Sequence, residues 1–175
     1  MRSSIIHSSL FVLLCVAGGC ATNYRWRSSV PEEMRTVTVP TFRNESNVSE
    51  IGAVASRQIL REFQREGTFK VRMNDDAAIE VQGVIKSVSP MMSAYNRRTG
   101  GRVAGYDVSA VVEISVIDRR SHKVLVDNRK YTARAVFTAG QDRTTAVRDA
   151  SGRLMDNLAQ QVVDDILNLK WRKEN

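Results

Sequence analysis

A regular alternation of apolar and polar side chains runs through residues 106–116 and restricts the fold more than any other feature of the sequence. Six apolar residues occupy every second position: Tyr106, Val108, Ala110, Val112, Ile114 and Val116. Because successive side chains of a β-strand point to opposite faces, this pattern predicts a strand with one buried face. The positions between them are mainly polar: Asp107, Ser109, Glu113 and Ser115. We therefore expect the second face of the strand to meet water.

Two segments show the spacing of amphipathic helices, with apolar residues every three or four positions. The first begins at Asn47 as the N-cap, has Glu50 three residues later and ends at Gly67. Its apolar stripe consists of Val48, Ile51, Ala55, Ile59 and Phe63. The second spans residues 142–169, with Asp142 as its N-cap. Its length would be roughly 40 Å unless the helix kinks near Gly152. Its stripe consists of Ala146, Ala150, Leu154, Leu158, Val162, Ile166 and Leu169. One stripe on each helix predicts that both face a core.

The remaining extended segments complete the predicted order of elements. They are residues 36–39, 69–73, 78–88 and 124–137, and Pro90 is expected to break or bend the third. The order is strand, helix, three or four mainly antiparallel strands, then helix. We therefore predict an α+β fold: a two-layer α/β sandwich with a mainly antiparallel sheet of about four strands and two helices on one face.

The N-terminus has the features of an export signal. Arg2 precedes an apolar run over residues 5–17 and two glycines. The run is much shorter than the roughly 20 residues that a spanning helix needs, so we expect cleavage rather than a retained anchor. Small residues followed directly by Cys20 resemble the bacterial lipobox, in which the cysteine and the new N-terminus receive acyl chains that form a stable anchor. Ordinary cleavage that leaves Cys20 free is the alternative.

The predicted division of the chain is a signal peptide at 1–19, a lipidated Cys and tether at 20–35, one α/β domain at 36–170 and a C-terminal tail at 171–175. A chain of 175 residues suits one core. Tyr24 and Trp26 on the tether either rest at the membrane interface or pack on the domain.

The residues left after cleavage restrict the chemistry. Cys20 becomes the only cysteine and His122 the only histidine, which excludes an internal disulfide and a Cys/His zinc cluster. His122 lies in a predicted turn and is expected to be solvated. The adjacent acidic pairs at 75–76 and 164–165 diverge in a strand or on a helix, so neither suits an acid/base dyad. We expect no enzyme activity, no metal and no cofactor.

The whole pattern resembles the lipopolysaccharide-assembly lipoprotein family of the Gram-negative outer membrane, LptE. The residues that carry the resemblance are Cys20, Tyr24, the segment 37–46 (VTVPTFRNES), the helix ending at Gly67 and the segment 75–78. The resemblance implies a non-enzymatic lipoprotein on the periplasmic side of the outer membrane. It would plug and help assemble a large LptD-like β-barrel and contact lipopolysaccharide. Other small α/β lipoproteins, including regulators of peptidoglycan synthases and components of secretion pores, begin similarly and are the alternative.

Positive charge concentrates in one segment. The formal net charge is +7, and residues 97–134 hold nine basic and four acidic side chains. A basic chain suits nucleic acid, an anionic membrane or an anionic ligand, but export leads us to expect no nucleic-acid partner. Because arginine binds phosphate oxygens bidentately, we predict contact with lipopolysaccharide phosphates. The candidates are Arg97, Arg98 and Arg102, with Arg129, Lys130 and Arg134 as weaker ones. A solvated loop that only aids solubility is the alternative.

Overall fold

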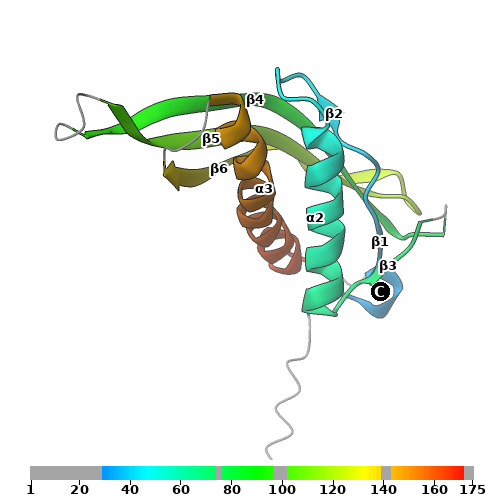
Figure 1. Cartoon of the computed structure of the whole chain (residues 1–175). Helices are drawn as coiled ribbons and strands as arrows, with labels where there is room; N and C mark the ends of the chain where they lie inside the picture. The colour runs from blue at the N-terminus through cyan, green and yellow to red at the C-terminus, as the bar shows by residue number, and fades with distance from the viewer. Residues whose placement is uncertain (1–28, 74–75, 97–101, 139–142, 172–175) are drawn as a thin grey trace, which may run out of the picture.

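The structure is a computed structural model that describes residues 29–73, 76–96, 102–138 and 143–171. Two α-helices lie on one face of a curved sheet (Figure 1). The elements in chain order are η1 (Glu32–Met34), β1 (Thr36–Thr38), β2 (Arg43–Asn44), α2 (Ile51–Glu66), β3 (Lys70–Val71), β4 (Ile79–Asn96), β5 (Arg102–Asp118), β6 (Lys123–Thr138) and α3 (Arg143–Leu167). The expected α+β class and the placement of both helices on one face are confirmed.

The sheet is mixed and has six strands, so the expected mainly antiparallel sheet of about four strands is wrong. Its order is β3-β1-β4-β5-β6, and β2 also pairs with β4. β1 runs parallel to β3 and β4, and β2 runs parallel to β4. β1 and β3 lie within the predicted extended segments 36–39 and 69–73, whereas β2, with only two residues, has no counterpart among the predicted segments.

Three long antiparallel strands form the rest of the sheet. β4, β5 and β6 have 18, 17 and 16 residues, and each pairs with the next. Pro90 does not end β4, which continues to Asn96. Beyond Ile85 the described neighbour of β4 is β5 alone, so a proline that cannot donate a hydrogen bond is tolerated there.

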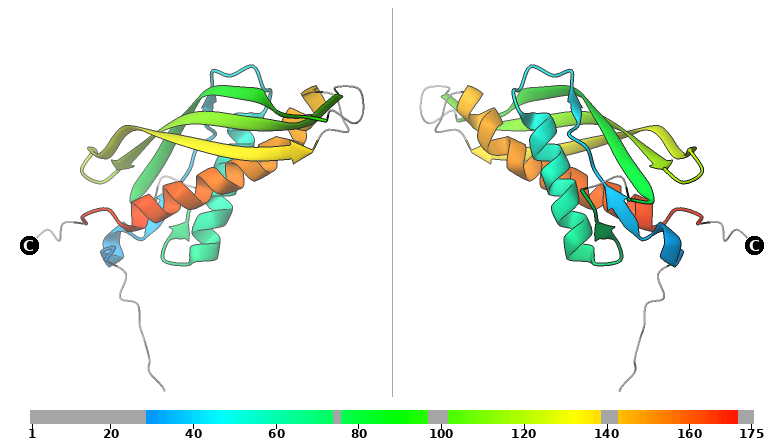
Figure 2. Two further views of the ribbon diagram at one scale, coloured as in Figure 1. Left: turned by 90° about the vertical axis from the view of Figure 1, so that its left-hand side faces the viewer. Right: turned by 90° about the vertical axis from the view of Figure 1, so that its right-hand side faces the viewer.

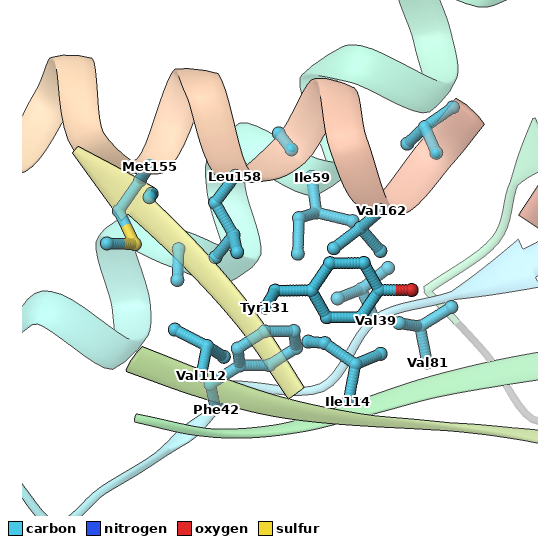
Figure 3. Packing of buried hydrophobic residues seen from close by; sticks show 14 of the residues in the cluster. Val39, Phe42, Ile59, Val81, Val112, Ile114, Tyr131, Met155, Leu158 and Val162 are labelled. Carbon is cyan, nitrogen blue, oxygen red and sulfur yellow. The ribbon is translucent and has the colours of Figure 1, made fainter. Parts of the chain in front are cut away.

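The core fills the space between the helices and the concave face of the sheet (Figure 2). The alternation expected in β5 is confirmed, because its even-numbered residues from Val108 to Val116 are buried. From α3, Met155, Leu158 and Val162 point toward Val112, Ile114 and Tyr131 of the sheet (Figure 3). Near the C-terminal end of α2, Phe63 packs edge to face on Phe69, with ring centroids 5.2 Å apart. Phe69 in turn contacts Trp171.

The helix ends agree only partly with the sequence pattern. Gly67 ends α2 in the left-handed conformation at φ 84°, as expected, and its N–H donates to the carbonyl of Phe63. Asn47 is not the N-cap of α2. Glu50 holds that position at φ 61° and makes no capping hydrogen bond through its side chain. Helix α3 runs from Arg143 through Gly152 as one element, and the expected cap Asp142 lies outside the described residues.

The loop between β1 and α2 is fixed by one buried side chain. The Oγ of Ser56 on α2 accepts from the N–H of Phe42 at 2.9 Å and lies 2.9 Å from the carbonyl oxygen of Pro40. Phe42 is buried and its ring lies against Gly83 of β4. The Pro-Thr-Phe part of the segment 37–46 therefore acts as a structural connection between the helix and the sheet.

Candidate functional site

The basic residues of the segment 97–134 divide among three places in the structure. One group is at the end of the β4–β5 hairpin, a second is in the turn between β5 and β6, and a third lies along β6. The predicted phosphate-contact residues belong to the first and third groups. The sequence segment is therefore not one continuous patch.

The hairpin end carries the three leading candidates. Arg97 and Arg98 lie outside the described residues. Arg102 opens β5 opposite Asn96, and its side chain is not among those described. The β4–β5 ladder continues to this pair, whereas β6 ends at Thr138 opposite Gly105. The paired ends of β4 and β5 thus extend past β6 and beyond the two helices (Figure 1).

Arg129 lies on the face of the sheet that the helices cover. Its Nη1 forms an ion pair with Oδ2 of Asp165 on α3 at 3.0 Å. The hydroxyl of Tyr131 donates to the same carboxylate oxygen at 2.9 Å. Burial, and then the hydrogen bond to Asp165, raise the pKa of Tyr131 to about 12, so this hydroxyl remains a donor at neutral pH. Arg129 is therefore part of a structural link between β6 and α3.

Lys130 and Arg134 lie on the opposite, open face of β6. Both side chains are exposed, and neither forms an ion pair within the described residues. Lys130 stands opposite Glu113 of β5, and Arg134 stands opposite Ser109. Unlike Arg129, these two residues are placed to meet an external anion.

A β-bulge explains why Arg129, rather than Lys130, lies on the face that the helices cover. Val126 pairs with Val116 and is buried, whereas Arg129 pairs with Ile114, so β6 has one more residue here than β5. Asn128, within this bulge, has φ 41°. The extra residue reverses which β6 positions face the helices.

The open face of the sheet is polar elsewhere too. Glu45 forms ion pairs with Arg43 at 2.6 Å and with Lys86 of β4 at 2.5 Å. The hydrogen bond from Lys86, and the charges of Lys86 and Arg43, lower the pKa of Glu45. Serine and threonine occupy much of the surface around Arg134, with Ser89, Ser109 and Thr132 as examples. The expected wet face is confirmed.

Other kinds of site find no support in the part of the chain that is described. Those residues contain no group of three or more His, Cys, Asp or Glu side chains that could hold a metal ion. His122 is exposed in the turn between β5 and β6, as expected. Within the described ranges, no helix combines the length and the hydropathy that crossing a membrane requires. The acidic pair at 164–165 contributes Asp165 to the link with Arg129 and Tyr131.

One feature that the sequence pattern did not reveal is a groove beside β6. It has a volume of about 460 Å³ and is lined by Thr132, Arg134, Asn157, Gln160, Gln161 and Asp164. The three amide residues come from one side of α3 at three- and four-residue spacing. This spacing of polar residues was the feature of the sequence that could have indicated the groove. It is common on solvated helices, however, so it does not distinguish a groove from an ordinary exposed helix face.

Comparison with known proteins identifies one family. A family model described as "LptE: Lipopolysaccharide-assembly" matches residues 34–168. A search of curated protein sequences finds no match. The match to the family covers nearly all the elements described above.

Several solved structures have a similar fold. A hypothetical protein from Chlamydia trachomatis superposes with a TM-score of 0.54 at 13% identity, covering 77% of this chain and 96% of that one. A protein described as uncharacterized lipoprotein B from Nitrosomonas europaea gives 0.51 at 14% identity, covering 81% and 87%. A protein from Xanthomonas campestris gives 0.50 at 8% identity, covering 78% and 88%. At these identities the likeness concerns the fold alone.

Proposed function

Because this chain belongs to the lipopolysaccharide-assembly family LptE, we propose that it is the lipoprotein component of an outer-membrane lipopolysaccharide translocon. In this role it plugs and helps to assemble an LptD-like β-barrel and contacts lipopolysaccharide, without catalysing a reaction. Cys20 is the lipid attachment point, and the chain is held on the periplasmic side of the outer membrane. The family match over residues 34–168 is the observation that carries the proposal.

The shape and polarity of the domain are compatible with a place inside a barrel. The lumen of a large outer-membrane barrel is polar and hydrated, so a plug needs a polar exterior. The open face of the sheet meets this requirement through Glu45, Lys86 and Lys130, while the buried apolar residues of β5 face the helices.

We assign the lipopolysaccharide contact to Arg97, Arg98 and Arg102. The support is their position in the sequence, between Asn96, where β4 ends, and Arg102, where β5 begins, and the affinity of guanidinium groups for phosphate. Arg129 is engaged by Asp165, so we do not include it in this contact. Lys130 and Arg134 lie in a different setting, on an edge strand, and are considered below.

The phosphate contact is tested with the full-length protein and purified lipopolysaccharide at low and high salt. The Arg97→Ala/Arg98→Ala/Arg102→Ala variant is expected to bind at least about tenfold more weakly at low salt, with a smaller difference at high salt. The matched control is Arg57→Ala/Arg61→Ala/Lys70→Ala, which removes three exposed basic side chains from α2 and β3. Unchanged binding by the hairpin variant, or an equal loss in the control, would refute the assignment.

The barrel partner is tested by affinity purification of the tagged chain from detergent-solubilised envelopes. We expect a large outer-membrane β-barrel to co-purify at near-equal amounts. Recovery of a peptidoglycan synthase or a secretion pore without such a barrel would replace the proposal with the alternative role.

A further inference from the structure

β6 forms one edge of the described sheet over 16 residues. The backbone groups of a strand point alternately to its two sides, so those not bonded to β5 are directed outward. The carbonyl oxygen of Arg134 is one of these, because it accepts from Nδ2 of Asn157 on α3 at 3.0 Å. By alternation, the backbone groups of Lys130, Thr132 and Val136 face the same way. The edge from 130 to 136 therefore presents outward hydrogen-bonding groups that another strand could use, except the carbonyl of Arg134, which Asn157 already occupies.

The side chains of β6 are unusual for a sheet edge that meets only water. Val136 is 67% exposed and Val124 is 51% exposed, and they are two of the three exposed large hydrophobic residues in the described part of the chain. Lys130 and Arg134 stand between them on the open face, both exposed. Exposed aliphatic side chains beside fixed charges are typical of an interaction surface.

The groove beside the edge offers room for the second face of an added strand. On the helix side of β6, Asn157, Gln160, Gln161 and Asp164 line this space of about 460 Å³, so the acidic row of an added strand must lie on the other side, beside Lys130 and Arg134. The amides of Asn157, Gln160 and Gln161 carry both donors and acceptors, which suits polar side chains of an incoming segment. A strand added to β6 would thus have one row of side chains beside Lys130 and Arg134 and the other row above the amides of α3.

The edge could pair with a second copy of this chain or with a segment of another protein, and the charges on β6 decide between them. In an antiparallel pair of two copies centred on Thr132, Lys130 of one copy would stand opposite Arg134 of the other. Pairs centred on Lys130 or on Arg134 would place each of these residues opposite itself. Directly opposed like charges destabilise strand pairing. Acidic side chains at the same positions would instead form cross-strand pairs of opposite charge.

We propose that the outward edge of β6, residues 130–136, binds an extended segment of a partner protein by strand addition, and that this segment carries acidic side chains at alternate positions. Backbone hydrogen bonds provide the register-independent part of the affinity, and Lys130 and Arg134 select the sequence and the register. The residues of this surface, 130–136, do not include Arg97, Arg98 or Arg102. An experiment can therefore reject strand addition at β6 and leave the proposed lipopolysaccharide contact intact, or reject that contact and leave strand addition intact.

The first test uses hydrogen exchange on the full chain in detergent with a seven-residue peptide, Glu-Val-Glu-Thr-Glu-Val-Glu. We expect the peptide to slow exchange at the outward amides of Lys130, Thr132, Arg134 and Val136. The amides of Tyr131, Ala133 and Ala135 face β5 and should not change. The same peptide with Lys in place of Glu should bind at least about tenfold more weakly. Absence of protection at the outward amides, or equal binding of the two peptides, would overturn the proposal.

Two variants separate the backbone from the charges. Thr132→Pro removes an outward N–H that β5 does not use, and it is expected to weaken peptide binding at least about tenfold while the fold is retained. Lys130→Ala/Arg134→Ala should weaken binding to a similar extent at low salt, with little difference at high salt. The matched control is Lys70→Ala/Arg72→Ala, which removes the same charge from β3 and the residue after it, at the other edge of the sheet. If the control loses as much affinity as the β6 variants, the site is not at this edge.

A photo-crosslinking residue at position 132 tests the surface in the cell envelope without relying on the peptide. The expected product is an adduct with a protein, in which the crosslinked segment is extended and rich in Asp or Glu. An adduct only with lipopolysaccharide, or only with a second copy of this chain, contradicts the proposal.

Discussion

At the scale of single residues, Gly83 shows how closely β4 approaches the loop that precedes α2. A Cβ at Gly83 would overlap the ring of Phe42, which is buried and fixed between the sheet and α2. Gly83→Ala is therefore expected to lower the free energy of unfolding by about 1–3 kcal/mol through overpacking. The control is Gly152→Ala in α3, where nothing lies within 4 Å of the added Cβ. It should raise the free energy of unfolding by about 0.5–1 kcal/mol. Urea denaturation of both variants measures the contrast, and a loss of equal size in both would contradict this explanation.

Ser56 is the second residue with a large expected effect. Its hydroxyl contacts the N–H of Phe42 and the carbonyl oxygens of Pro40 and Gly52 within 3.0 Å. Ser56→Ala would leave a buried backbone N–H without an acceptor, which costs about 1–3 kcal/mol. Chemical denaturation should show this loss. Ser46→Ala, which removes an exposed hydroxyl from the same loop, should cost less than half as much. Equal costs would mean that burial at Ser56 is not the cause.

The raised pKa of Tyr131 leads us to expect that the free energy of unfolding depends on pH in the alkaline range. Its pKa is raised to about 12 in the fold by burial and by the hydrogen bond to Asp165, against about 10 in an unfolded chain. The stabilisation is therefore complete below about pH 10 and is lost as the pH rises from about 10 to about 12. The difference in the free energy of unfolding between wild type and Tyr131→Phe should shrink over this interval. A difference that stays constant with pH would show that the raised pKa is not coupled to folding.

At the scale of secondary-structure elements, the length of each periodic pattern decides what the sequence can predict. The stripe of α2 and the alternation in β5 extend over many residues, and the structure buries Ile51, Ile59 and Phe63 from the first and Val108–Val116 from the second. In contrast, β1, β2 and β3 form because β4, or a strand paired with it, lies beside them. The sequence pattern indicated β1 and β3 as extended segments but not β2, and the parallel pairing of all three depends on tertiary contacts that the local sequence does not encode.

Helix α3 is buried over a wider arc than its single predicted stripe. Met155, Ala159 and Val163 are buried beside the predicted Leu154, Leu158 and Val162. The reason is that α3 packs against α2 as well as against β5 and β6. A stripe analysis assumes one packing partner, so it identified one row of buried residues and missed the rest of the buried arc.

At the scale of the whole molecule, the regional excess of positive charge was predictable, but its division between the two faces of the sheet was not. The bulge between Val126 and Arg129 reverses which β6 positions point toward the helices: the even-numbered Val126 is buried before it, and odd-numbered residues such as Tyr131 are buried after it. Arg129 consequently meets Asp165, while Lys130 meets solvent. Counting charges along the chain cannot detect this, because one extra residue in one strand reverses the alternation.

The attachment of the whole molecule to the membrane is the last prediction. If Cys20 is acylated, the eight residues 21–28 connect it to Ser29 at the start of the described domain, a reach of roughly 30 Å when fully extended. Such a short connection would keep the domain close to the membrane surface, as a partner of an outer-membrane barrel requires. Cys20→Ser is expected to abolish metabolic labelling with palmitate, because it removes the thiol that receives the acyl chain, while binding to the barrel can still keep the protein in the membrane fraction. Cys15→Ser is the matched control: it changes the other cysteine, which lies in the predicted signal peptide, and should leave labelling and fractionation unchanged. Palmitate label on the Cys20→Ser variant would place the anchor elsewhere in the chain.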